Sequence, residues 1–189
     1  MKKLAMILIL LLAPATSFAD DPFYRSGNLY TVYNLVNFKD FGAGNATGFA
    51  FQAGYDITSW LALEGHVGMT NDVKQSVTSG ATYTDTKVRA SYASLVGRGN
   101  LRFGRTTVFA FAGVTYLEVK GSVDYNGTSR GVISDTDTGA TYGFGVDLYG
   151  SENAAITLKA TRVYKPKDNK AKISSNLDSV MLGITYYIP

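Results

Sequence analysis

The stretch GFAFQAGYDITSWLALEGHVGM, residues 48–69, contains two alternating runs that flank a short polar turn. In each run, apolar side chains occupy one parity, while small, polar or ionisable side chains occupy the other. Successive side chains of a strand point to opposite faces, so each run predicts a strand with one apolar and one small or polar face. The stretch therefore predicts a hairpin. What its apolar face contacts depends on how many further strands share the pattern.

Eight runs along the chain have strand character. They cover about residues 28–38, 47–57, 60–70, 87–102, 107–120, 140–150, 154–165 and 178–188. Their connections alternate between long polar segments (39–46, 71–86, 121–139 and 166–177) and short ones (58–59, 103–106 and 151–153). Barrels of the outer membrane alternate short periplasmic turns with long external loops. We therefore expect an all-β fold, an eight-stranded antiparallel up-and-down transmembrane β-barrel.

The first 19 residues have the features of a secretory signal peptide. Lys2 and Lys3 precede an apolar run at 4–13, and Ser17-Phe18-Ala19 forms a small-x-small cleavage site. A membrane anchor helix is the alternative, but the apolar run is short for one. We expect residues 1–19 to be removed and residues 20–189 to form one exported domain.

Composition narrows the classes of function. Without Lys2 and Lys3, the remaining basic residues nearly balance the 15 acidic ones, so we expect no nucleic-acid partner. The chain has no cysteine, which excludes disulfides and thiol chemistry. Beyond the leader, no apolar stretch has the length of a membrane helix. An integral protein of this sequence must cross as a closed barrel, because closure satisfies every backbone group in hydrocarbon.

The apolar parity of the runs predicts the lipid-facing surface. It comprises Phe49, Phe51, Tyr55, Leu61, Leu63, Phe144, Val146, Leu148, Leu182, Ile184 and Tyr186. The run at 28–38 is apolar on both parities, so its inward face is not assigned.

The opposite parity carries charges that would face the lumen. We expect Glu64, Arg98, Glu118, Asp147 and Lys159 to form a polar network there. For run 107–120 we choose the parity that leaves Glu118 inward. This choice places four residues outward: Phe109, Phe111, Leu117 and Val119. The lumen of an eight-stranded barrel is filled by side chains, so acids and bases should pair across it. The alternative is the wet face of a soluble sandwich.

His66, the single histidine, is the one candidate centre for catalysis. It shares a face with Glu64, two residues away, and this pair could support acid–base or single-metal chemistry. One histidine without clustered ligands is a weak signal for either. We expect no catalytic residue, no cofactor and no metal site.

Three segments resemble one known family. GFAFQAGYDITSWLALEGHVG, SLVGRGNLRFG and VFAFAGVTY look like the second and central hairpins of the small eight-stranded outer-membrane β-barrels, the class of the OmpA transmembrane domain and OmpX. The resemblance implies a non-enzymatic protein of the bacterial outer membrane with a salt-bridge network in its lumen. It also implies three kinds of partner: outer-membrane lipids and lipopolysaccharide, the outer-membrane assembly machinery, and a host or surface ligand bound by loops 71–86 and 121–139.

Three other functions remain open at this point. Lipid-modifying enzymes, acyl transferases or deacylases, exist on barrels of this size, and such an enzyme would need a site centred on His66. A small-solute channel would need an open lumen. A soluble, exported ligand-binding barrel would need an apolar cavity in place of Glu64 and Arg98.

Overall fold

The computed structural model describes residues 29–41, 44–79, 82–125, 128–164 and 176–188. The expected signal peptide at 1–19 lies outside the described residues. Within them, no helix has the length and apolar character needed to cross a membrane.

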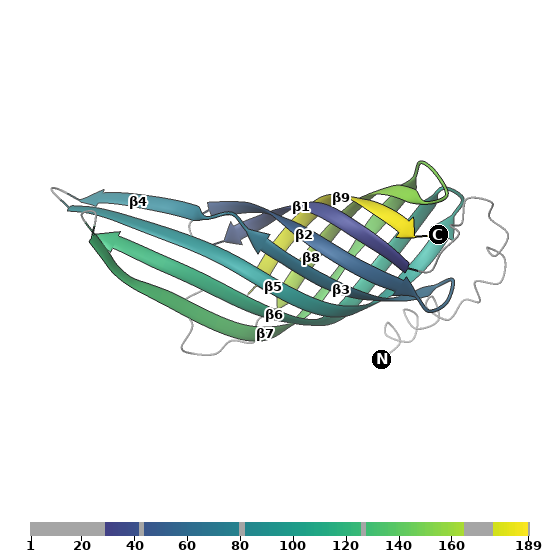
Figure 1. Ribbon diagram of the computed structural model, residues 1–189, viewed down its shortest axis with the longest axis horizontal. Coiled ribbons are helices and arrows are strands. Elements are labelled where there is room, and N and C mark those ends of the chain that lie inside the picture. The colour runs from purple at the N-terminus through teal and green to yellow at the C-terminus, as the bar shows by residue number, and fades with distance from the viewer. Residues whose placement is uncertain (1–28, 42–43, 80–81, 126–127, 165–175, 189) are drawn as a thin grey trace, which may run out of the picture.

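The described chain forms one antiparallel sheet that closes on itself (Figure 1). Its strands are β1 (Leu29–Phe41), β2 (Gly44–Asp56), β3 (Leu61–Thr70), β4 (Val73–Ser79), β5 (Thr82–Phe103), β6 (Thr106–Tyr125), β7 (Thr128–Tyr149), β8 (Ala154–Tyr164) and β9 (Asn176–Ile188). β1 pairs with β9, and β3 pairs with β5, which closes the ring. β3 and β4 both lie along β5 and act as one interrupted strand. The predicted eight-stranded barrel is therefore confirmed.

Three segments expected to be loops are mostly strand. In the predicted loop at 39–46, β1 continues to Phe41 and β2 begins at Gly44. The predicted loops at 71–86 and 121–139 instead continue the sheet as β4 and as the ends of β5, β6 and β7, with pairs such as Val73 with Val88 and Thr84 with Tyr125. Figure 1 shows these strands projecting well beyond the rest of the barrel. Outside a membrane both faces of a strand can be polar, so polarity alone did not distinguish strand from loop here. We call this part, residues 73–79, 82–90, 118–125 and 128–139, the extension.

The outer surface of the barrel carries an apolar band with a sharp edge. In β6 the outward side chains run from Val108 to Tyr116 before Glu118 follows, and in β9 they run from Ile188 to Val180 before Asp178. These lengths fit the ~9–11 residues with which a tilted strand crosses a bilayer. The residues of the predicted lipid-facing surface given above lie on this outer surface, exposed or, for Leu61 and Val146, half-buried. Phe109 and Phe111, which were also placed outward, are instead buried.

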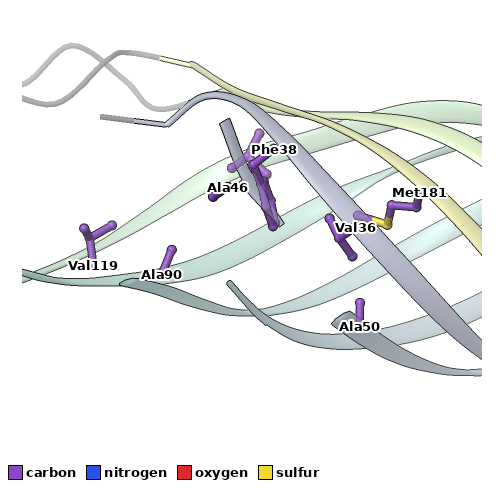
Figure 2. Packing of buried hydrophobic residues seen from close by; sticks show 8 residues of the cluster. Val36, Phe38, Ala46, Ala50, Ala90, Val119 and Met181 are labelled. Atoms are coloured by element: carbon purple, nitrogen blue, oxygen red, sulfur yellow. The ribbon is translucent and has the colours of Figure 1, made fainter. Parts of the chain in front are cut away.

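β1 turns apolar side chains to both faces because part of the lumen is itself apolar. Tyr30, Val32, Val36 and Phe38 point inward and are buried. Toward the extension, a cluster fills the barrel with side chains from β1, β2, β5, β6, β8 and β9 (Figure 2): Val36, Phe38, Ala46, Ala50, Ala90, Val119, Val163 and Met181. The interior is thus layered, with this apolar cluster near the extension and charged residues nearer the short turns.

Glycine on the inner face makes room for an aromatic ring on the neighbouring strand. Gly54 of β2 pairs with Tyr30 of β1. A Cβ atom built on Gly54 would lie 2.2 Å from the Cζ atom of Tyr30, far inside van der Waals contact. Absence of a side chain at residue 54 therefore leaves room for the Tyr30 ring against β2, and the Tyr30 hydroxyl reaches Glu64.

We predict that Gly54→Ala destabilises the barrel. The added methyl group must displace the Tyr30 ring, and overpacking of this kind costs about 1–3 kcal/mol of unfolding free energy. Urea unfolding in lipid vesicles measures this loss. Gly65→Ala is the matched control, because Gly65 lies on the outer face of β3 and a Cβ atom added there would have nothing within 4 Å. Equal stability of the two variants would contradict the packing argument.

Candidate functional site

Arg98 of β5 is the centre of the polar layer in the lumen. Its side chain is buried, and its Nη1 donates to Glu64 Oε1 at 2.9 Å, while its Nη2 donates to Asp147 Oδ2. Its Nε donates to Asn100 Oδ1 at 2.7 Å. The guanidinium carbon lies 3.7 Å from the ring centroid of Phe109, in cation–π contact. One side chain therefore links β5 to carboxylates on β3 and β7.

Glu64 of β3 accepts hydrogen bonds from three directions. Besides Arg98, the Tyr30 hydroxyl donates to Oε1 at 2.6 Å, and His66 Nε2 lies 2.6 Å from Oε2. The carboxylate is fully buried, and charged groups are stable in such surroundings only when they are paired and hydrogen-bonded. Glu64 meets both conditions.

Asp147 extends the network to the far wall of the barrel. Its Oδ1 accepts a hydrogen bond from Thr157 Oγ1 at 2.7 Å, and Thr157 is in turn hydrogen-bonded to Thr185. The chain of contacts Glu64, Arg98, Asp147, Thr157 and Thr185 therefore crosses the lumen from β3 to β9. Such a chain closes the interior with polar groups that satisfy one another.

Lys159 of β8 is buried in the same region but is not joined to the network by an ion pair. Within the part of the chain that the structure describes, it forms no ion pair. Its Nζ lies 5.2 Å from the ring centroid of Phe111, within cation–π range. The structure thus brings together Glu64, Arg98 and Asp147 by direct contact and places Lys159 beside them.

The structure contradicts the expectation that Glu118 belongs to the polar network in the lumen. It lies on the outer face of β6, 28% exposed, and accepts hydrogen bonds from Lys120 Nζ at 3.0 Å and Ser91 Oγ at 3.3 Å. Phe109 and Phe111, which were expected to face lipid, are the buried inward residues of this strand. The hydrogen bond from Lys120 lowers the pKa of the Glu118 carboxyl.

The error has a physical reason. Glu118 lies past the edge of the apolar band, where an outward carboxylate meets water instead of lipid, so its charge did not require an inward position. The inward phenylalanines occupy space opened by glycines of β7: a Cβ on Gly145 would meet the Phe109 ring, and one on Gly143 the Phe111 ring. The sequence signal that could have indicated the inward phenylalanines was the presence of glycines at the facing positions of the next strand.

Sequence reasoning also missed a second ion pair nearer the short turns. Arg102 Nη2 lies 3.1 Å from Asp56 Oδ2, and both side chains are buried. Asp56 shares the parity of Gln52 and Gly54 in β2, so its inward position could have been inferred from alternation alone. Its location at the end of the predicted strand made it look like a turn residue.

The arrangement around His66 does not resemble an open catalytic centre. The ring is buried, with Glu64 on one nitrogen and Phe111 5.9 Å away between ring centroids. Among the described residues, no group of three or more His, Cys, Asp or Glu side chains is placed to hold a metal ion. What the geometry provides is a buried, hydrogen-bonded cluster in the lumen.

A family model described as "Outer membrane protein beta-barrel domain" matches residues 5–186. No curated protein matches the sequence significantly.

Several solved structures share the fold. The N-terminal β-barrel domain of Pseudomonas aeruginosa OprF is 16% identical, with a TM-score of 0.59, over 86% of this chain and 100% of that one. Neisserial surface protein A is 19% identical (TM-score 0.58; 85% and 97%). Ail, the attachment invasion locus protein of Yersinia pestis, is 16% identical (TM-score 0.53; 85% and 96%).

We predict that Arg98→Met strongly destabilises the protein. The substitution leaves Glu64 and Asp147 buried without their shared cation, and breaking a buried ion pair in this way costs about 3–5 kcal/mol. Urea unfolding in vesicles, together with the refolded fraction on unheated gels, measures the loss.

Arg89→Gln is the control, because the Arg89–Asp72 pair, at 2.8 Å, lies at the base of the extension with both side chains exposed. Exposed pairs contribute little to stability. If Arg98→Met unfolded at the same urea concentration as Arg89→Gln, the lumen network would not stabilise the barrel.

Proposed function

Because the chain belongs to the outer membrane protein beta-barrel domain family and is therefore a protein of the outer membrane, we propose that it acts there without catalysing a reaction. Its role is to support the envelope and to make contacts at the cell surface. The observation that carries this proposal is the combination of a filled lumen with a sheet that continues beyond the apolar band. The barrel anchors the protein, and the extension is the part available to partners.

The filled lumen argues against conduction. A solute would have to pass the buried apolar cluster around Phe38 and Met181 and then the Arg98 network. Both layers consist of side chains in mutual contact, as expected for a barrel of eight strands. A channel would require both layers to rearrange.

The same burial argues against a lipid-modifying enzyme. Glu64 and His66 point into the lumen, whereas membrane lipids contact the outer face. Glu64 already accepts hydrogen bonds from Tyr30, His66 and Arg98, which occupy three of the four lone-pair positions of its carboxylate. These contacts support a structural role for His66.

The extension has the character of a surface that meets water and partners. Its outer face carries partly exposed ion pairs, including Lys87 with Asp124 at 3.7 Å and Lys120 with Glu118 at 3.0 Å. Segments displayed on a rigid scaffold are the usual place for recognition. We propose that outer-membrane lipids and lipopolysaccharide contact the apolar band and that a host or surface ligand contacts the extension. The assembly machinery of the outer membrane inserts the barrel.

We predict that the extension is outside the cell. The chain contains no cysteine, so single-cysteine variants can be labelled without background. Lys87→Cys on the extension should react with a membrane-impermeant maleimide on intact cells. Glu152→Cys on the turn between β7 and β8 should react only after the outer membrane is permeabilised. The reverse labelling pattern would show that the barrel is inserted in the opposite orientation, with the extension on the periplasmic side.

We also predict a closed and catalytically silent lumen. Purified protein in planar bilayers should give no stable conductance steps, because the buried apolar cluster and the Arg98 network both occupy the lumen. Cells that produce the wild-type protein or His66→Ala should have the same lipid A mass profile. Stable single-channel openings would support a channel instead, and a lipid A change that depends on His66 would support an enzyme.

A further inference from the structure

A hollow lies on the outer face of the barrel where β7, β8 and β9 run side by side. Its volume is about 350 Å³, within the ~300–1,000 Å³ range of small-molecule pockets. Its lining is mainly apolar, and the outward side chains that surround it are Tyr142, Phe144, Ala160, Arg162, Asp178 and Val180. The hollow opens outward, away from the lumen, so it is separate from the polar network.

The register of three strands forms the hollow. Phe144, Ala160 and Val180 lie side by side in one row across the sheet. Ala160 is the small member of this row, so the surface is low at its centre and walled by Phe144 on one side. The same position on the next row toward the short turns is Leu158, which fills the surface.

The row toward the extension is polar and closes the upper end of the hollow. It consists of Tyr142, Arg162 and Asp178, paired in register across the three strands. Arg162 donates from Nε to Asp178 Oδ1 and from Nη2 to Asp178 Oδ2, both at 2.6 Å, and Tyr142 is its register partner on β7. This fixed guanidinium sits at the edge of the apolar band.

An apolar hollow that faces the hydrocarbon does not remain empty. Its walls would lose dispersion contacts, and the apolar surface offers few partners to water. An acyl chain is continuous with the rest of the lipid shell around Phe144, Leu158 and Val180. The polar end of the hollow favours a lipid that also carries a phosphate group, because guanidinium groups bind phosphate through planar, charge-assisted hydrogen bonds.

Arg162 retains donors for such a contact. A guanidinium carries five N–H groups, and the fork to Asp178 uses two of them. The side chain is 46% exposed, so its remaining edge is accessible from the membrane surface. The two hydrogen bonds to Asp178 hold the group in place and lower the entropy lost when it binds a headgroup.

We propose that this hollow binds lipopolysaccharide of the outer leaflet, with one acyl chain lying over Ala160 and a phosphate group of lipid A on Arg162. The inference rests on the proposed external position of the extension, because that position puts Arg162 in the outer leaflet. It names a lipid site on the barrel and is independent of any ligand of the extension.

Native mass spectrometry of the folded protein in detergent with added purified lipid A tests the proposal. Wild-type protein should retain one lipid A molecule. Ala160→Leu fills the hollow, and Arg162→Gln removes the guanidinium. Each variant should reduce lipid A retention on the order of tenfold, which is the effect of losing one charge-assisted hydrogen bond. Ala53→Leu places the same side chain on the outer face of β2, away from the hollow, and should retain lipid A as the wild type does.

Unheated gels confirm that each variant is folded before binding is measured. Retention that is equal in Ala160→Leu and Ala53→Leu would overturn the site, and retention unaffected by Arg162→Gln would overturn the phosphate contact. A dimer that Ala160→Leu abolishes would show that a second copy occupies the face. Cysteine labelling tests orientation separately, so an inverted barrel is distinguishable from a failed lipid site.

Discussion

Closure of the sheet is the constraint on which the rest of the structure depends. In hydrocarbon no water can satisfy a free backbone N–H or C=O group, so a sheet with an open edge is not stable there. Pairing of β1 with β9 and of β3 with β5 removes both edges. Closure then divides every strand into an outer parity that meets lipid and an inner parity that must fill a narrow interior. Beyond the apolar band this division relaxes, and the strands of the extension carry ion pairs on their outer face.

The interior meets the filling requirement in two different ways. Near the extension, Phe38, Met181 and their neighbours pack as an ordinary hydrophobic core. Nearer the short turns, Arg98 is hydrogen-bonded to Glu64, Asp147 and Asn100 and lies against the Phe109 ring. The first layer excludes water, and the second satisfies charges that water would otherwise solvate. Together they leave the outer band and the extension as the surfaces on which the protein can act.

Much of the fold could be predicted from alternation, while part of the site could not. The inward positions of Glu64, Arg98, Asp147 and Lys159 follow from parity in strands whose other face is plainly apolar. Parity failed where both faces are apolar, as in β1, and where an aromatic residue packs over a neighbouring glycine, as in β6. Glu118 was misplaced because the rule that charges avoid the outer face holds only within the band. The long polar segments were read as loops because strand pairing outside a membrane leaves no hydrophobic signature.

The sequence by itself determined the all-β fold, the number of barrel strands and most of the lipid-facing surface, because these follow from the period of two and from the spacing of turns. Only the tertiary structure decided which side chains meet. The Arg98 contacts join residues 34 and 49 positions away, and the hollow over Ala160 arises from three strands held in one register. Register between strands is set by closure of the whole ring, so no single stretch of sequence encodes it.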